Sequence, residues 1–593
     1  MKLSDYVADF LAQQNIRYAF VVTGGASVHL IDSIARHPDI DYVCPQHEQA
    51  GAMAADGYAR ASGHLGVAIA TSGPGATNLL TGVCSAFYDS IPVLYLTGQV
   101  STFRMKGSSG VRQIGFQETD TVPIFQPVTK YSVLLDRPER IRFELEKAVH
   151  IARTGRPGPV LIDIPDNLQR AEVDPSAMES FVPEAVGTIS RPSDEDIDAC
   201  LDLLAHAERP VMIPGWGIHL AGAEHEWREL VEALGIPVAP TWAAADLIPS
   251  DHPLCIGTFG THGTRYANFA VQNADFILAI GSRLDTKATG SPAATFARGA
   301  RKFVVDIDSC ELRKFPLFGL QIDRLCNADA QVFISALRRR GSSRTRPDIS
   351  RWLGRIRDWK TRYPICPSSY DSEVDVNPYV WVKALARECA DDATLVIDTG
   401  CTVAWMMQAY DFKARQRLFH DFNNTAMGWA LPASIGISFA RNRGEVICVT
   451  GDGSLQMNIQ ELATVIRHKL PIKIFLIDNG GYSMIQQTQE QWLDSRYEAS
   501  TVDGGLAFPD FLKVATAYGF QTVEIIRNSE IQDRIRQVLQ TEGPVFCNVR
   551  ISSHHRVNPQ VKFGRPNEDS APLLTRQEFL QNMLVPLCEV SSL

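Results

Sequence analysis

Apolar runs of strand length alternate with segments of helical period along nearly the whole chain of 593 residues. Clear strand-length runs in the first third are residues 18–22, 66–71, 93–97 and 160–164. This alternation is typical of parallel sheets, because each parallel connection needs a crossover that a helix usually supplies. The predicted fold class is therefore α/β, with doubly wound parallel sheets.

Two stretches interrupt this alternation and divide the chain. Residues 174–194 are rich in Pro, Ser and Glu, and residues 338–370 contain a run of Arg, Ser and Gly. A chain of this length exceeds one core, since about 150 residues per domain is usual. We therefore expect three α/β domains and a tail, at residues 1–175, 190–340, 370–553 and 554–593.

Composition excludes several classes of protein. A formal net charge of −10 argues against a nucleic-acid surface, because phosphate contacts need clustered Lys and Arg. No apolar run approaches the roughly 18 residues that a membrane span needs. The first ten residues carry Lys2, Asp5 and Asp9 and no apolar signal core, and the 12 cysteines form no CxxC pair. These features predict a cytoplasmic protein with reduced thiols.

The most informative segment predicts a metal and diphosphate site. Strand-like residues 446–450 lead into Gly451-Asp452-Gly453, and a second strand ends in Asp478-Asn479. Both strands of a right-handed βαβ unit end on the same sheet edge, so Asp452 and Asn479 should converge on one ion. A helix starting near Ser454 would point its positive end at a diphosphate, and the oxygen ligands suit Mg²⁺. The alternative is a plain strand–turn–helix with chance polar residues.

This segment resembles the thiamine-diphosphate motif, in which Gly-Asp-Gly is followed by Asn-Asn. Asp478 stands here in place of the first Asn. The resemblance implies that Asp452, Asn479 and the backbone carbonyl of Gly481 bind Mg²⁺. It also implies thiamine diphosphate as cofactor, contacted by Thr399, Gly400, Gly451, Gly453 and Ser454.

The amino-terminal third resembles the acetolactate synthases. The carrying residues are His47-Glu48-Gln49, before a helical run at 50–61, and the octet Thr-Ser-Gly-Pro-Gly-Ala-Thr-Asn at 71–78. The resemblance places Glu48 as the acid that hydrogen-bonds the cofactor's aminopyrimidine, a role suited to a carboxyl group in an apolar pocket. Pro74 and Asn78 are then cofactor contacts. Taken alone, Glu48 would read as a surface residue capping a helix.

Further matches to the same family follow in chain order. Thr23-Gly24-Gly25-Ala26 and Phe116-Gln117-Glu118 add Gly25 and Gln117 to Glu48 as candidate catalytic residues. Met427 takes the position of the apolar residue beneath the bent cofactor, a bend that brings its reacting groups together. Lys130 is a further candidate for contact with the acceptor.

The central third resembles the flavin-binding stretches of the same synthases, which implies FAD. Gly215-Trp216-Gly217 lacks the third glycine of a dinucleotide fingerprint and is a weak signal by itself. The residues that the resemblance assigns to FAD are Gly215, Gly217, Thr261, His262, Gly263, Gly281, Ser282, Arg283, Asp285, Asp306 and Asp308.

The resemblance implies a carboligase that decarboxylates a 2-keto acid, most simply pyruvate, and transfers two carbons to a ketone. The family builds each site across a subunit interface, which implies a homodimer or homotetramer. Thr488 stands where the synthases have a Trp that selects the acceptor, and Lys287 replaces an Arg that would meet its carboxylate. The tail resembles that of carboligases acting on nucleotide-linked 4-keto sugars, as in yersiniose formation, so pyruvate and a larger ketone both remain open as acceptors.

Two other classes remain as alternatives. One is a thiamine-diphosphate decarboxylase, or an enzyme acting on an acyl-CoA, without carboligation. The other is a non-enzymatic protein that has kept the fold. Such a protein is expected to lose Glu48 or Asp452, and both are present here.

Overall fold

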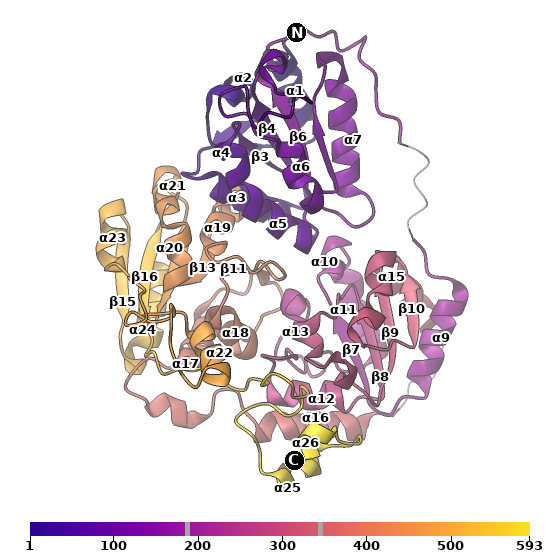
Figure 1. Ribbon diagram of the computed structural model, residues 1–593. Coiled ribbons are helices and arrows are strands. Elements are labelled where there is room, and N and C mark those ends of the chain that lie inside the picture. Colours follow the sequence, from indigo (N-terminus) through magenta and orange to yellow (C-terminus); the bar gives the residue numbers. More distant parts are fainter. Residues whose placement is uncertain (184–189, 342–347, 593) are drawn as a thin grey trace.

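Three parallel sheets make up the framework of the residues that the computed structural model describes, 1–183, 190–341 and 348–592 (Figure 1). The first sheet has strand order β2-β1-β3-β4-β6-β5, and the third has order β12-β11-β13-β14-β16-β15. Counted from each domain's first strand, the two orders are identical. The central sheet has order β10-β9-β8-β7. The predicted α/β class with three parallel-sheet domains is confirmed.

The amino-terminal domain surrounds the first sheet. Its strands are β1 (Tyr18–Val21), β2 (Asp41–Val43), β3 (Gly66–Ala70), β4 (Val93–Gln99), β5 (Tyr131–Leu134) and β6 (Val160–Pro165). Its helices are α1 (Leu3–Gln13), α2 (Val28–Arg36), α3 (Glu48–Ser62), α4 (Pro74–Asn78), α5 (Leu80–Asp89), α6 (Thr121–Phe125), α7 (Ile141–Arg153) and α8 (Asp166–Gln169).

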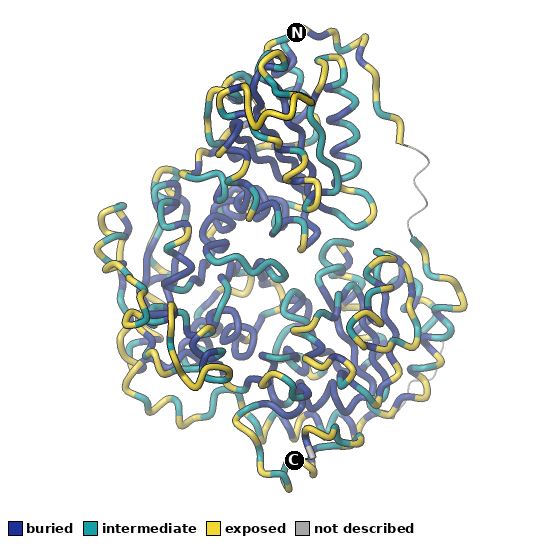
Figure 2. Tube along the Cα trace, viewed as in Figure 1, coloured by how far each residue is buried: buried dark blue, intermediate teal, exposed yellow. Residues whose placement is uncertain are grey.

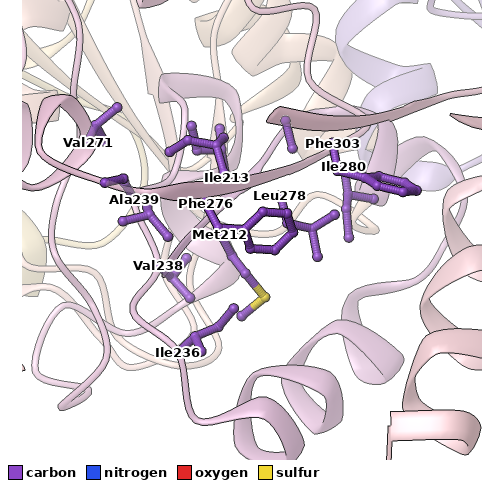
Figure 3. Packing of buried hydrophobic residues seen from close by; sticks show 14 of the residues in the cluster. Met212, Ile213, Ile236, Val238, Ala239, Val271, Phe276, Leu278, Ile280 and Phe303 are labelled. Atoms are coloured by element: carbon purple, nitrogen blue, oxygen red, sulfur yellow. The ribbon is translucent and has the colours of Figure 1, made fainter. Parts of the chain in front are cut away.

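The central domain carries the second sheet. Its strands are β7 (Pro210–Pro214), β8 (Phe276–Ile280), β9 (Arg301–Asp306) and β10 (Arg324–Asn327). Its helices are α9 (Asp194–Ala205), α10 (Gly217–Leu220), α11 (Glu224–Leu234), α12 (Arg265–Gln272), α13 (Thr286–Thr289), α14 (Ser309–Arg313), α15 (Ala330–Gly341) and α16 (Ser350–Arg362). Figure 3 shows its core, where Met212, Leu278 and Phe303 from three adjacent strands pack together.

The carboxyl-terminal domain carries the third sheet and the tail. Its strands are β11 (Thr394–Ile397), β12 (Arg417–Phe419), β13 (Val446–Gly451), β14 (Ile472–Asp478), β15 (Gln521–Ile525) and β16 (Val545–Arg550). The helices are α17 (Pro378–Glu388), α18 (Cys401–Ala409), α19 (Ala430–Ala440), α20 (Asp452–Met457), α21 (Leu462–His468), α22 (Ser483–Trp492), α23 (Phe511–Tyr518), α24 (Ile531–Gln540), α25 (Arg576–Asn582) and α26 (Glu589–Ser592).

Helix α16 shows that the expected break at residues 338–370 is wrong. Trp352, Ile356 and Trp359 are buried and belong to the core of the central domain. The Trp359 indole donates to Asn582 Oδ1 in the tail at 2.8 Å. Helix α15 also extends into the expected break, and residues 342–347 lie outside the described ranges.

The tail returns to the central domain after leaving the third sheet (Figure 1). Glu568 is fully buried there and contacts Arg298 at 2.7 Å. The Arg265 guanidinium donates to the carbonyl of Pro572 at 2.6 Å. The tail therefore connects the third domain to the second.

The first and third domains share a core through helices α3 and α19. Both are rich in Ala and Gly, and both are buried along most of their length, as the dark blue segments between the two sheets in Figure 2 show. A Cβ at Gly57 would lie 2.5 Å from the carbonyl oxygen of Ala433, and one at Gly436 would lie 1.9 Å from that of Ala54. Glycine is needed at both positions because the two backbones touch.

A buried ionic network joins the central domain to β12. The His219 ring lies 2.9 Å from Asp246 through Nε2 and 2.9 Å from Glu224 through Nδ1. Arg417 approaches Asp246 at 3.4 Å and Glu224 at 3.5 Å. Burial alone would lower the pKa of His219, but the two carboxylates outweigh that effect and raise it.

We expect His219→Asn to destabilise the fold in a pH-dependent way. A histidine with a raised pKa stabilises the folded state fully below its unfolded pKa of about 6.5, and this contribution is lost as pH rises through the folded value. Breaking a buried ion pair costs about 3–5 kcal/mol, so the loss should be large near pH 6 and smaller near pH 9. Thermal unfolding of wild type and variant across this range measures it. His225→Asn, at an exposed pair with Glu229, is the control and should show no such trend. An equal loss at both pH values would contradict the expectation.

No helix in the described ranges combines the length and the low polarity that crossing a lipid bilayer requires.

Candidate active site

The carboxyl ends of β13 and β14 bring the predicted metal ligands together. Oδ2 of Asp452, the first residue of α20, accepts hydrogen bonds from the backbone N–H groups of Asn479, Gly480 and Gly481, at 3.2, 2.8 and 3.2 Å. Oδ1 of Asp452 accepts from the Gly453 N–H at 2.6 Å. The loop after β14 is therefore folded around this carboxylate. Burial raises the pKa of Asp452 to about 7.

The oxygens at this edge form a donor set suited to a hard cation. The side-chain amide of Asn479 has two terminal atoms, an oxygen and a nitrogen. One of them lies 2.7 Å from the Gly481 carbonyl oxygen and 3.2 Å from Asp452 Oδ2, and the other lies 2.8 Å from Ser483 Oγ. The amide can lie in two orientations: with its nitrogen toward Asp452 and Gly481 it donates to both, and with its oxygen toward them it brings three oxygens together. A hard cation such as Mg²⁺ would select the second orientation. A cluster of three or more His, Cys, Asp or Glu ligands is not found in the described ranges.

Two helix amino termini face the same edge. Helices α18 and α20 start at the ends of β11 and β13, and neither has a side-chain N-cap in the described chain. Gly400, the N-cap residue of α18, has a φ of 81°, which favours glycine. Uncapped N–H groups at adjacent helix starts form a natural diphosphate site.

The helix expected to start near Ser454 starts earlier and is short. Helix α20 begins at Asp452, and a 3₁₀ turn at Ile459–Glu461 separates it from α21. The break follows Asn458, whose side chain donates to the Gly428 carbonyl at 2.8 Å and so competes with helical geometry. Ser454 is therefore within the first turn of α20, and it is buried.

Met427 lies against the metal loop. A Cβ at Gly453 would lie 3.2 Å from Met427 Cε and 2.1 Å from Tyr482 Cε1. Glycine at 453 thus lets both side chains approach the backbone beside Asp452. The sequence interpretation did not include Tyr482, which directly follows the Gly481 carbonyl.

The amino-terminal candidates gather at the carboxyl edge of the first sheet. Glu48 is the first residue of α3 and is half-buried, and the Asn78 amide donates to its Oε2 at 3.0 Å. A Cβ at Gly75 would lie 3.4 Å from Glu48 Oε1. Pro74 is the exposed first residue of α4, and Gly25 is exposed at the start of a 3₁₀ turn after β1.

Gln117 is held in an unusual backbone conformation next to this group. Its φ is 63°, and its Cβ lies 3.0 Å from the position of a Cβ on Gly73. The adjacent Glu118 accepts hydrogen bonds from the N–H groups of Lys106, Ile114 and Gly115, at 2.6, 2.9 and 3.1 Å. Glu118 therefore fixes the loop that presents Gln117.

Lys130 has partners of its own away from Glu48 and Gln117, and its contact with the acceptor stays a prediction. Its ammonium group donates to the backbone carbonyls of Ile151 and Thr154, at 2.5 and 2.7 Å. These carbonyls lie at the carboxyl end of α7 and just beyond it, so Lys130 stabilises that helix end. Burial lowers its pKa to about 8.

The two halves of the predicted site remain separate within one chain. In residues 1–183, 190–341 and 348–592, no hydrogen bond or ion pair joins Glu48 to Asp452, Asn479 or Gly481. The large side chain next to Gln117, Phe116, is 86% exposed.

Most of the predicted flavin residues line two adjoining cavities between the domains. The smaller cavity, of about 110 Å³, is lined by Gly215, Thr261, His262, Gly281, Ser282, Arg283 and Asp285. The larger, of about 580 Å³, is lined by Gly217, Gly281, Arg283 and Asp306. Gly263 and Asp308 line neither. Asp308 instead pairs with Arg156 of the first domain at 3.2 Å.

The cavities have features that suit a nucleotide. A Cβ at Gly215 would lie 2.3 Å from the Gly281 carbonyl, so the two loops touch at the mouth of the sheet. Trp216 lines both cavities, and its indole N–H and the Nε of Arg283 are buried without hydrogen-bond partners in the described residues. The Trp216 N–H is available to a ligand with acceptor oxygens, whereas the Arg283 Nε lies 3.5 Å from Glu311. The sequence interpretation missed Trp216 because only its flanking glycines belonged to a pattern.

Comparison with known proteins agrees with this geometry. Three family models match in order: the thiamine pyrophosphate enzyme N-terminal TPP-binding domain at residues 1–124, the central domain at 197–337, and the C-terminal TPP-binding domain at 398–549.

Relatives match along almost the full length. The acetolactate synthase of Arthrospira platensis is 34% identical over 95% of this chain and 96% of that protein. The acetolactate synthase isozyme 2 large subunit of Escherichia coli K12 is 33% identical over 96% of this chain and 99% of its own. The probable large subunit of Methanocaldococcus jannaschii is 34% identical, with 93% and 92% covered. This chain therefore belongs to the acetolactate synthase-like family of thiamine-pyrophosphate enzymes.

Proposed function

We propose that this enzyme uses thiamine diphosphate and Mg²⁺ to decarboxylate pyruvate and to transfer the two-carbon unit to a ketone acceptor. The observation that carries the proposal is the convergence of Asp452, Asn479 and Gly481 beside two uncapped helix starts. The names of the relatives, all acetolactate synthases, support pyruvate as donor and acetolactate as a product.

The roles of the residues follow from their positions. When bound, thiamine diphosphate supplies the carbon nucleophile and the electron sink for loss of CO₂. Asp452, Asn479 and the Gly481 carbonyl would hold Mg²⁺, and the N–H groups at the starts of α18 and α20 would bind the diphosphate. Glu48 exchanges a proton with the aminopyrimidine, and Asn78 orients its carboxyl group. Met427 and Tyr482 support the ring system.

The active unit in this proposal is at least a homodimer. Glu48 and the metal ligands have no contact within one described chain, so a second copy is needed to bring an acid from one subunit to the metal of the other. The loop next to Gln117 supports this arrangement because Phe103, Ile114 and Phe116 are 71, 61 and 86% exposed. Large apolar side chains exposed together are typical of a subunit interface.

FAD is proposed as a second, largely structural cofactor in the two interdomain cavities. Their combined lining offers close-packed glycines, acidic groups at the end of β9 and the buried Trp216 N–H, which has no hydrogen-bond partner in the described residues. Absorbance of the purified protein between 350 and 500 nm tests this assignment.

The acceptor site is proposed to lie between α22 and the smaller cavity. Lys287 lines that cavity, and its ammonium group has no hydrogen bond or ion pair within the described residues. It is therefore available to an anionic group on the acceptor. Thr488 lies on α22, which begins two residues after the Gly481 carbonyl, and its hydroxyl is turned back to the Met484 carbonyl at 3.1 Å. A small side chain here favours a larger ketone as a second candidate acceptor.

Product analysis tests the proposal. Purified protein is incubated with pyruvate, Mg²⁺ and thiamine diphosphate, with and without a nucleotide-linked 4-keto sugar. Acetolactate or a two-carbon-branched sugar supports carboligation. Release of acetaldehyde and CO₂ alone would instead favour a simple decarboxylase.

Thr488→Trp should shift the choice of acceptor. If Thr488 makes room for a large ketone, the indole fills that space and lowers kcat/KM for it by about 10-fold or more, while pyruvate is affected less. Competition between the two acceptors, read as a product ratio, measures the shift. Ile485→Trp, at a half-exposed position on the same helix, is the matched control. An unchanged ratio in Thr488→Trp would contradict a role in acceptor choice.

A further inference from the structure

We propose that Asp421 is a positioning residue, which fixes the turn at residues 421–427 and thereby the side chain of Met427. The proposal rests on the proposed role of Met427 as support for the cofactor. The turn lies between β12 and α19, and Met427 is its only residue that the sequence predicted to have a role.

The backbone has a positive φ on both sides of Met427, and it is strained at Thr425. Thr425 has a φ of 52°, and Gly428 has a φ of 84°. A β-branched residue in the left-handed region is a true outlier, and it persists only where its surroundings determine it. Something must therefore hold Thr425 in place.

Asp421 closes the turn through both its side chain and its main chain. Its carbonyl oxygen accepts from the Thr425 N–H at 3.1 Å. Its Oδ2 accepts from the Ala426 N–H at 2.8 Å and from the Ser85 hydroxyl at 2.9 Å. Asp421 is fully buried, so these hydrogen bonds are shielded from water.

A second buried carboxylate holds the other side of Met427. Asp398, at the end of β11, accepts from the Gly428 N–H at 3.1 Å and from the Ala430 N–H at 3.3 Å. The same side chain accepts from the Thr399 N–H at 2.9 Å and the Thr450 hydroxyl at 3.1 Å. The N–H groups of Ala426 and Gly428, the residues on either side of Met427, thus both donate to buried carboxylates. Asp398 also connects this segment to the loops that follow β11 and β13.

The amino-terminal domain of the same chain anchors this turn. Asp89 of α5 accepts from the N–H groups of Phe422 and Asn423, at 2.9 and 3.1 Å. Arg60 of α3 pairs with Asp89 at 2.9 Å and donates to the His420 carbonyl at 3.0 Å. The turn therefore connects α3 and α5 to Met427, and the hydrogen bond from the Ala426 N–H to Asp421 holds the residue directly before Met427.

The test compares cofactor affinity with stability in Asp421→Asn. Asparagine keeps the shape but weakens the acceptor, so the dissociation constant for thiamine diphosphate with Mg²⁺ should rise about tenfold. Tryptophan fluorescence titration of the apo-protein measures it without turnover. In the Asp421→Asn background, Thr425→Gly should recover part of the affinity, because glycine adopts the required φ without strain.

A buried carboxylate away from the turn serves as control. Glu144 of α7 is 4% exposed and pairs with Arg140 at 2.7 Å. Glu144→Gln should lower the unfolding temperature without changing cofactor affinity. If Asp421→Asn does not fold, Ser85→Ala removes a single donor to Asp421 and should weaken binding in the same direction.

The outcomes separate this proposal from the proposed function. Wild-type affinity in Asp421→Asn, or an equal loss in Glu144→Gln, would overturn the positioning role. If the wild-type protein itself did not bind thiamine diphosphate with Mg²⁺, the proposed function would fail first, and the role built on it would fall with it.

Discussion

Replacing Glu48 with glutamine should lower kcat by about 10²–10⁴-fold, the range expected when one general acid–base group is lost. Glutamine keeps the length of the side chain and an oxygen that can accept from Asn78, now at 3.0 Å from Glu48 Oε2. It cannot exchange a proton with the aminopyrimidine. The loss should therefore appear in kcat, while the dissociation constants for thiamine diphosphate and Mg²⁺ change far less.

A second half-buried glutamate in the same domain provides the control. Glu146 on α7 pairs with Arg142 at 2.9 Å, away from the candidate site. Glu146→Gln should keep wild-type kcat. Full turnover by Glu48→Gln would remove this residue from the chemistry, and a parallel loss of cofactor binding would assign it to binding instead.

The fold was predictable from the sequence because its signals are local. The strand β3 (Gly66–Ala70) coincides with the expected run 66–71 to within one residue, and the edge formed by β13 and β14 follows from two apolar runs and the handedness of their connection. The sequence boundary at 338–370 was wrong because a charged surface masked the helix. Its signal was present, since Trp352, Ile356 and Trp359 recur at helical spacing.

The supports of the site were not predictable in the same way. Asp421 binds Ser85, which is 336 positions away, and Arg60 binds the carbonyl of His420, which is 360 positions away. Nothing near these residues in the chain indicates such partners. Lys130 is a similar case, because a lone Lys before a strand gives no sign in the sequence of the helix end that it binds.

The first and third domains share a topology, and this explains the position of the candidate catalytic and metal-binding residues. The first and third sheets have the same strand order, so each presents loops at its carboxyl edge in the same arrangement. One edge carries Glu48 and the other carries Asp452. A ligand placed between two such edges is contacted by an acid on one side and a metal on the other.

Asp452→Asn should abolish the stabilisation of the protein by Mg²⁺ and thiamine diphosphate while leaving the apo-protein folded. A ligand present at 100 times its dissociation constant stabilises the native state by about 2.7 kcal/mol, so the wild-type unfolding temperature should rise clearly on addition of both. Asparagine removes the only carboxylate among the three oxygens that converge at the edge of the sheet. It also removes a buried negative charge, and this limits the loss of stability of the apo-protein. The loss is not zero, because four backbone N–H groups donate to the Asp452 carboxylate and the asparagine amide accepts fewer of them.

The neighbouring aspartate makes the experiment decisive. Asp478 ends the adjacent strand, but its carboxylate contacts the Asn548 amide at 3.0 Å and Arg550 at 3.8 Å instead of the converging oxygens. Asp478→Asn removes the same charge from the residue directly before Asn479, whose carboxylate contacts Asn548 and Arg550, and should keep the ligand-induced shift. Bound metal, measured by atomic absorption after desalting, should be lost in Asp452→Asn alone. Equal retention of the metal in both variants would mean that the ion is held elsewhere, because the variant without the Asp452 carboxylate would then bind it as well as the control.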